Sequence, residues 1–199
     1  MLTALRSQSV SPSTKRSARR MRTGLLGAAA LASLLALVPT RAEAIPPALQ
    51  AGTRPMWGFF GMGGAIGMTS FSGSQFRLSE EFGYHFSGKS DGPAIGGILA
   101  ESFGSGFFGF QVGPKFTWDF QIVRDLGVYL APTAHIAFAL AGAGGSAAAG
   151  FNFGFGFEGK LVIMNRGIVF FRPFELDFFA GDFPFQARYN LSFGGGVIF

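Results

Sequence analysis

Polar and charged side chains recur at every second position in several stretches of this 199-residue chain. Around residues 108–119, Gln111, Lys115 and Asp119 alternate with phenylalanine, valine and tryptophan. Because successive side chains of a β-strand point to opposite faces of the sheet, this spacing places the polar groups on one common face. The alternating polar set comprises Glu81, Glu101, Gln111, Lys115, Asp119, His135, Asn152, Glu158, Lys160, Glu175, Asp177, Arg188 and Asn190.

If that face is enclosed, its charges must be paired or hydrogen-bonded, because an isolated charge is costly in a low-dielectric interior. The alternating polar set holds six acidic and three basic residues, so some carboxylates would share protons or bind water or a cation. Two functions remain open, a gated or proton-coupled conduit and a closed polar network that plugs a lumen. We favour the closed network.

His85 and Ser87 form the one short motif that could carry catalysis. The stretch His85-Phe86-Ser87 resembles the dyad of outer-membrane lipid A deacylases, in which a histidine activates a serine nucleophile. The match extends over three residues, and no third residue to orient the imidazole is apparent. The strand phase turns both side chains inward, whereas the dyad of that family faces lipid. A hydrogen-bonded interior histidine is therefore preferred, and an enzyme is the alternative.

The sequence predicts no metal site, no cofactor and no nucleic-acid partner. The glycine-rich stretch 61–67 lacks the lysine of a phosphate-binding loop, and no strand–helix pattern surrounds it. Cysteine is absent, and no spacing of His, Asp and Glu suits a transition metal. The net charge of +5 is misleading, because seven of the sixteen basic residues lie in the first 44 positions. The remainder carries nine basic and ten acidic residues, a balance of −1.

Eight β-strands must position these side chains. Alternating apolar and polar residues, interrupted by turn-forming residues, predict eight strands of roughly ten to thirteen residues. Their alternating parts fall at about 57–68, 76–86, 93–103, 108–119, 128–138, 151–161, 174–178 and 186–199, and the seventh strand lies between the turns at 165–167 and 181–185. The predicted loops and turns are 69–75, 87–92, 104–106, 124–127, 142–146, 165–167 and 181–185. For the first and third strands, the pattern does not establish which residues face inward and which face outward.

The contents of the two faces indicate which face is outside. One face carries phenylalanine, tryptophan, leucine and valine in series, and the other mixes glycine with polar residues. An eight-stranded barrel has a lumen barely wide enough for side chains, so the aromatic face would overfill it. Strands of about 9–11 residues can cross a bilayer, and closure leaves no unpaired edge in lipid. The sequence therefore predicts a transmembrane barrel rather than a soluble lipocalin-type barrel.

The last predicted strand ends with the chain and has an apolar outer face. That face consists of Tyr189, Leu191, Phe193, Val197 and Phe199. Such a strand resembles the sorting and assembly signal of bacterial outer-membrane β-barrels, and the mature chain resembles small OmpA/OmpX-type barrels. The resemblance implies an all-β, eight-stranded antiparallel up-and-down barrel, monomeric, with both termini periplasmic and the last strand paired near Trp57. It also implies contact with outer-membrane lipids, and with periplasmic chaperones and the barrel assembly machinery during biogenesis.

Residues 1–44 have the order of a cleavable secretory signal peptide. A basic stretch precedes the apolar run 24–38, and the small-residue site Ala42-Glu43-Ala44 follows. The run is shorter than the roughly 20 residues of a spanning helix, so we expect cleavage after Ala44, with Met21 as a possible start. The predicted organisation is a signal peptide (1–44), a periplasmic lead-in (45–55) and an outer-membrane barrel (56–199).

Three residues conflict with regular strands. Pro114 and Pro132 fall within strands, where proline removes a ladder donor, so we expect local bulges or irregular pairing there. Arg172 has the parity of the lipid-facing side, where arginine at mid-bilayer costs about 2–4 kcal/mol. Either a bulge at Pro173 shifts the phase of the strand, or Arg172 extends to the membrane interface.

The functional prediction is a structural or envelope-integrity barrel without large-solute transport. The predicted loops are short and leave little surface for adhesion. Two alternatives remain: a lipid A-modifying enzyme that uses His85 and Ser87, and a narrow channel or carrier for small or apolar molecules.

Overall fold

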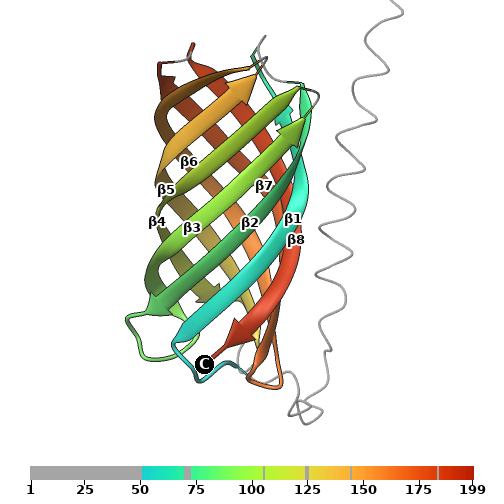
Figure 1. The fold of residues 1–199 in the computed structure, drawn as a ribbon. Helices are drawn as coiled ribbons and strands as arrows, with labels where there is room; N and C mark the ends of the chain where they lie inside the picture. The colour runs from blue at the N-terminus through green and yellow to red at the C-terminus, as the bar shows by residue number, and fades with distance from the viewer. Residues whose placement is uncertain (1–50, 70–72, 105, 124–125, 144, 183) are drawn as a thin grey trace, which may run out of the picture. The chain divides into compact units, whose positions relative to one another are not determined.

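The computed structural model describes residues 51–69, 73–104, 106–123, 126–143, 145–182 and 184–199. The predicted signal peptide and residues 45–50 of the lead-in lie outside the described residues. The described chain forms a barrel whose strands lean across the barrel axis (Figure 1). Over these residues, no helix is both long and apolar enough to span a membrane.

Every strand pairs antiparallel with its neighbours in the sequence, and the first also pairs with the last, so the sheet closes on itself. The strands are β1 (Met56–Gly67), β2 (Ser74–His85), β3 (Gly92–Gly104), β4 (Phe107–Gln121), β5 (Val128–Ala143), β6 (Ser146–Ile163), β7 (Gly167–Gly181) and β8 (Gln186–Ile198). At the seam, Trp57 lies opposite Ile198, and Met56 and Phe199 exchange backbone hydrogen bonds of 3.0 and 2.9 Å. The predicted eight-stranded antiparallel barrel is confirmed, including the pairing of its last strand with its first.

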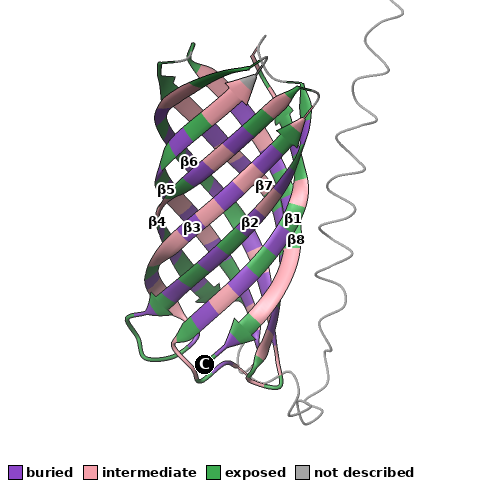
Figure 2. Cartoon of the chain, viewed as in Figure 1, coloured by how far each residue is buried: buried purple, intermediate pink, exposed green. Residues whose placement is uncertain are grey.

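Alternation along the sequence becomes alternation between lumen and exterior (Figure 2). Along β2, burial switches at nearly every residue. Phenylalanine dominates the outside, where Phe82 is 67% exposed and Phe151 is 65% exposed. The outer face of β8 carries Tyr189, Leu191, Phe193, Val197 and Phe199. An apolar surface that encircles the whole barrel is typical of contact with a membrane.

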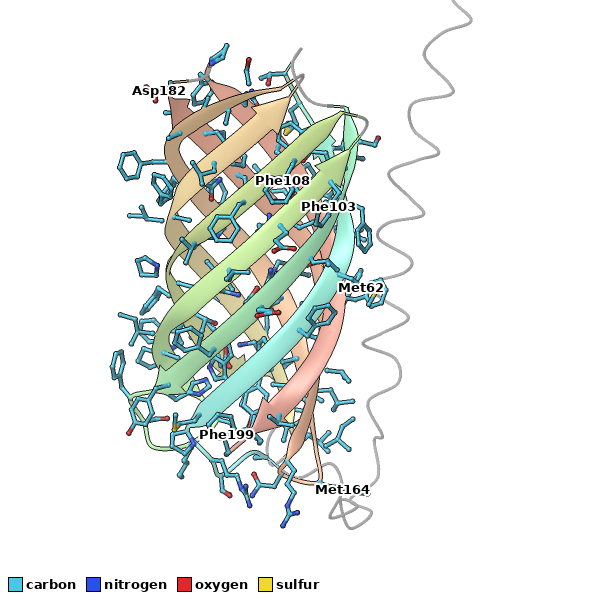
Figure 3. The ribbon with its side chains drawn as sticks, viewed as in Figure 1. Met62, Phe103, Phe108, Met164, Asp182 and Phe199 are labelled. Atoms are coloured by element: carbon cyan, nitrogen blue, oxygen red, sulfur yellow. The ribbon has the colours of Figure 1, made fainter. Side chains whose placement is uncertain are left out.

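The two ends of the barrel carry different parts of the chain. Phe199 and the β6–β7 turn at Met164 lie at one end, which we call the terminal end, and Asp182 lies at the other, the far end (Figure 3). An even number of strands returns the last strand to the end where the first began. The Met164–Asn165 turn has positive φ at both residues, 53° and 50°, which matches the twist of a tight hairpin.

The prediction of a loop at 142–146 is wrong for most of its length. β5 continues to Ala143, β6 begins at Ser146, and these two residues are paired. The sequence 142–146 contains only glycine, alanine and serine, so it shows no alternation of apolar and polar residues. The two strands nevertheless supply each other with hydrogen-bond partners here. Pairing in register therefore extended both strands where the side-chain pattern had ended.

Neither proline produces the bulge that was one of the two expected outcomes. In the β4–β5 pair, Gly113 and Pro114 of β4 have no paired partner, and neither do Trp118 and Asp119, which lie opposite Ala131 and Pro132 of β5. After each gap the pairing continues in the same register. The other partners, β3 for Pro114 and β6 for Pro132, pair without interruption. The missing N–H groups thus make the pairing irregular without inserting a residue.

A bulge does occur next to Arg172. The β7–β8 register shifts between Arg172 and Glu175, and the β6–β7 register shifts between Phe157 and Gly159. Arg172 therefore points into the lumen, where it is 1% exposed. Of the two alternatives for this residue, the change of phase at Pro173 is confirmed and the extension to the interface is excluded.

The lumen near the terminal end is filled by apolar rather than polar side chains. The apolar cluster comprises Trp57, Phe59, Tyr129, Val162, Ile168, Phe170 and Ile198. Trp57 stacks on Phe59 with ring centroids 4.3 Å apart, and Phe59 stacks on Phe170 at 5.2 Å. Gly83 makes room for this stack, because a Cβ there would lie 2.4 Å from the Trp57 ring.

Candidate functional site

Ten charged side chains point into the lumen from β2, β4, β6, β7 and β8, and each is at most 3% exposed. The carboxylates are Glu81, Asp119, Glu158, Glu175 and Asp177, and the cations are Arg77, Lys115, Lys160, Arg172 and Arg188. Five negative and five positive charges balance to zero, with the two histidines left out of the count. We call these ten residues the lumen network.

This balance corrects the predicted excess of acids. Arg77 and Arg172 lie inside although the alternating polar set omitted them. Glu101 is on the outer face of β3, opposite the outward-facing Leu78 and Phe110. Because every buried carboxylate has a cation within reach, proton sharing or a bound cation is no longer needed to explain the set.

Near the apolar cluster, Asp119 is the centre of the first group of contacts. Lys160 Nζ donates to both of its carboxylate oxygens at 2.8 and 2.9 Å, and Thr117 Oγ1 donates at 2.9 Å. The Lys160 ammonium also lies 5.2 Å from the centroid of the Trp57 ring, a cation–π distance. The charged group and the aromatic stack therefore stabilise one another.

The middle of the lumen is bridged by Arg172. Its Nη2 lies 2.8 Å from Glu81 Oε1, and its Nε lies 3.0 Å from Glu158 Oε2. Lys115 contacts the same two carboxylates, Glu81 directly and Glu158 at 3.3 Å. Two acids and two bases thus form a compact, fully buried square of charges.

Towards the far end, Asp177 is the central hydrogen-bond acceptor of a third group of contacts. Arg77 donates to it at 2.8 Å, Arg188 at 2.7 Å and the Asn190 amide at 2.9 Å. His135 Nε2 lies 3.3 Å from the other carboxylate oxygen of Asp177. A Cβ at Gly154 would lie 2.2 Å from the His135 ring, so this approach requires glycine.

Shared residues join the three groups into one network along the lumen. Lys160 also lies 3.0 Å from Glu158. Glu175 receives both Arg172, at 3.1 Å, and Arg77, at 3.0 Å. Ion pairs therefore run without a break from Asp119 to Arg188, and removal of one member would leave its partners buried and uncompensated.

The terminal end is covered by residues 51–55, the described part of the predicted lead-in. Gly52 N donates to Tyr129 Oη at 3.0 Å, and Thr53 N donates to Asn165 Oδ1 at 2.8 Å. Ser90 Oγ donates to the carbonyl of Arg54 at 2.7 Å. These contacts tie the segment to β5 and to two turns, so it lies across the mouth of the barrel. We call residues 51–55 the mouth segment.

His85 and Ser87 do not form a dyad. His85 is 2% exposed, with Nε2 2.9 Å from Asp119 Oδ2 and Nδ1 3.0 Å from the carbonyl of Pro55. Ser87 is exposed, and its Oγ donates to the backbone carbonyl of Asp91. The two side chains are each engaged elsewhere, and His85 is an interior histidine with a carboxylate facing one ring nitrogen and a backbone carbonyl facing the other.

The other predicted polar residues are distributed between the network and the far end. Asn152 accepts from His135 Nε2 at 2.6 Å, and Asn190 also donates to Glu175 at 3.1 Å. Gln111 is 3% exposed and lines a small hollow of about 20 Å³ that is partly open to solvent. Gln75 and Arg188 line the same hollow.

Sequence reasoning missed three features for different reasons. Arg77 has the parity of Glu81 on the same strand, so the alternation alone could have found it. Arg172 lies inside only under the alternative of a bulge at Pro173, which the sequence pattern could not choose over an extension to the interface. The mouth segment has no periodicity, because its contacts are backbone hydrogen bonds to distant side chains.

No arrangement of His, Asp and Glu among the described residues could hold a metal ion. No protein-family model matches the chain, and no curated protein matches it. Solved structures do. Neisserial surface protein A superposes with a TM-score of 0.54 at 15% identity, covering 75% of this chain and 99% of that one.

Two further structures match at lower similarity. The N-terminal β-barrel domain of Pseudomonas aeruginosa OprF superposes with a TM-score of 0.44 at 13% identity, covering 75% of this chain and 100% of that one. Ail, the attachment invasion locus protein of Yersinia pestis, superposes with a TM-score of 0.41 at 12% identity, covering 75% of this chain and 99% of that one. The likeness to Neisserial surface protein A shows the fold. The fold and the interior thus define a small, closed eight-stranded antiparallel barrel with an ion-paired lumen.

Proposed function

We propose that this protein is an integral outer-membrane β-barrel with a structural role in the envelope and a closed lumen that does not transport large solutes. The observation that carries the proposal is the unbroken, charge-balanced lumen network. A solute passing through would have to separate buried ion pairs at several levels. Breaking one such pair by removing a partner costs about 3–5 kcal/mol, which makes an open path a rare state.

The ends and the exterior support the same proposal. The mouth segment covers the terminal end, and the exterior is predominantly apolar around its circumference. Residues 1–44 would direct export and be removed near Ala44, and the outer face of the last strand would serve assembly. In this proposal the terminal end faces the periplasm, the barrel is a monomer, and its partners are outer-membrane lipids and the assembly factors.

Three measurements test location and closure together. Fractionation should recover the protein in the outer membrane, and the folded barrel should migrate differently on a gel before and after boiling. Liposomes that contain the folded protein should swell no faster in small sugars than protein-free liposomes. Recovery in the soluble fraction without a mobility shift would reject the location, and fast swelling would reject the closed lumen.

The enzymatic alternative has no supporting geometry. A lipid A deacylase would need His85 and Ser87 to interact, and each is bound elsewhere. We expect Ser87→Ala to leave the lipid A profile of the cell as it is in the wild type. A narrow channel or carrier would need an emptier lumen than the one that the ten charges and the apolar cluster fill.

A further inference from the structure

Two carboxylates lie on the lipid-facing side of the barrel, outside the lumen network. Glu80 is exposed between Leu78 and Phe82 on the outer face of β2, and Glu101 is half-buried on the outer face of β3. Neither makes a hydrogen bond or an ion pair with any described residue. They are therefore ionisable groups without a partner among the described residues, on a surface that is otherwise mostly apolar.

Their position within the sheet places them close together. Glu80 lies near the middle of β2, opposite Phe60 of β1 and Leu99 of β3. Glu101 lies opposite Leu78, so the two carboxylates are diagonal neighbours on one face. Diagonal residues of paired strands are roughly 7–8 Å apart, within reach of long side chains. A single cation could therefore approach both.

Beside Glu80 the outer surface has a shallow, wide-open groove of about 490 Å³. The outward-facing residues that line it are Gly58, Phe60, Glu80, Phe82, Gly195 and Val197. Gly58 and Gly195 have no side chain to cover the sheet, and a Cβ at Gly58 would touch nothing closer than 3.9 Å. The groove thus has an apolar floor with one carboxylate at its edge.

Charge complementarity identifies the occupant. Ionisable groups within a membrane are costly, and those that persist pair with a partner group. A second copy of this chain offers no such partner, because its described lysines and arginines lie in the lumen network, in the mouth segment or in turns at the terminal end. The partner must bring a cation of its own to this depth.

We propose that the groove between β8, β1 and β2 binds a membrane-embedded segment of another protein that carries an arginine or lysine facing Glu80 and Glu101. The apolar floor takes the body of the segment, and the two carboxylates pair with its cation. This inference rests on the membrane location proposed above.

The test uses synthetic transmembrane peptides in liposomes that hold the full mature protein. One peptide is poly-leucine with a central arginine, and its control has leucine at that position. Energy transfer between labelled protein and labelled peptide should show at least tenfold tighter association of the arginine peptide. Glu80→Gln combined with Glu101→Gln should abolish this preference, and Gly58→Leu, which fills the groove, should weaken binding of the arginine peptide.

Asp182→Asn is the matched control, since it removes an exposed carboxylate outside the groove, and it should keep the full preference. Equal binding of the two peptides, or a preference that survives the double variant, would overturn the inference. So would self-association of the wild type that depends on Glu80. The gel shift of the same samples separates the two proposals: inserted protein without a preference rejects this inference alone, and failure to insert rejects the proposed location as well.

Discussion

Arg172 of β7 reaches across the lumen to Glu81 of β2, with Nη2 2.8 Å from Oε1. These strands are not neighbours, because β8 and β1 separate them around the barrel. The contact therefore spans the interior rather than running along one sheet pair. It exists only because the bulge after Arg172 turns this side chain inward.

Replacing Arg172 by alanine should strongly destabilise the barrel. The change leaves Glu81, Glu158 and Glu175 buried with one cation fewer, and the expected loss is about 3–5 kcal/mol in the free energy of unfolding. Urea unfolding of the protein in lipid vesicles, followed by tryptophan fluorescence, measures it. Arg166→Ala, an exposed arginine in a turn, is the control and should stay within about 0.5 kcal/mol of the wild type.

A double-mutant cycle of Arg172→Ala with Glu81→Gln should give a coupling energy well above 0.5 kcal/mol, roughly the additivity limit for independent sites. Additive effects, or an Arg172→Ala variant as stable as the Arg166→Ala control, would show that the contact across the lumen is not formed in solution.

Tyr129→Phe should loosen the mouth segment. The hydroxyl of Tyr129 accepts the backbone N–H of Gly52 at 3.0 Å, and its loss removes a hydrogen bond worth about 0.5–1.5 kcal/mol. Amide hydrogen exchange should become faster at Gly52 and Thr53 while the strands keep their protection. Tyr84→Phe, on the outer face, should leave the exchange of the mouth segment unchanged. Equal exchange in both variants would mean that the segment is held by other contacts.

Gly154→Ala should disturb the group around Asp177. The new Cβ would lie 2.2 Å from the His135 ring and 2.5 Å from Asp177 Oδ1, so both side chains must move. Overpacking of this kind costs about 1–3 kcal/mol. Thermal unfolding compares it with Gly159→Ala, whose Cβ would find its nearest neighbour, the Phe171 carbonyl, at 3.9 Å. A Gly154→Ala variant no less stable than Gly159→Ala would contradict the described contact.

Deletion of Phe199 should impair assembly in the cell more than it impairs the stability of the folded barrel. Its side chain is 52% exposed on the outer face, so little buried surface is lost. The backbone bonds to Met56 are confined to the end of the seam. Pulse-chase labelling of the boiling-sensitive folded form measures assembly, and unfolding of the purified protein measures stability. Phe185→Ala, which changes an exposed residue near the far end, should affect neither assembly nor stability. If Phe185→Ala impaired assembly as much as deletion of Phe199 does, Phe199 would not act as a specific assembly signal.

Alternation was enough to predict most of the architecture. The strand of Phe108 to Trp118 and the last strand have clear period-two patterns, and a closed barrel must turn one of their two faces outward. The phase of β1 could not be predicted, because glycine occupies both faces and Trp57 and Phe59 point inward with a parity that the pattern left ambiguous.

Local changes of strand geometry account for the errors in predicting which side chains point into the lumen. A single bulge reversed the side of Arg172, which sequence parity placed in lipid. Glu101 was assigned inward from an ambiguous strand, and its true position follows from the register with Leu78 and Phe110. Charge balance could have served as a check, since six acids with three bases in a narrow lumen is a costly arrangement.

Single-channel recording of the folded wild type in planar bilayers tests the closed lumen most directly. The lumen network and the mouth segment predict a silent protein, without reproducible steps of conductance at any applied voltage that the bilayer withstands. A reproducible conductance that disappears in the Lys115→Ala and Arg188→Ala variants would contradict this account, because it would show that ions pass through the network that we describe as closed.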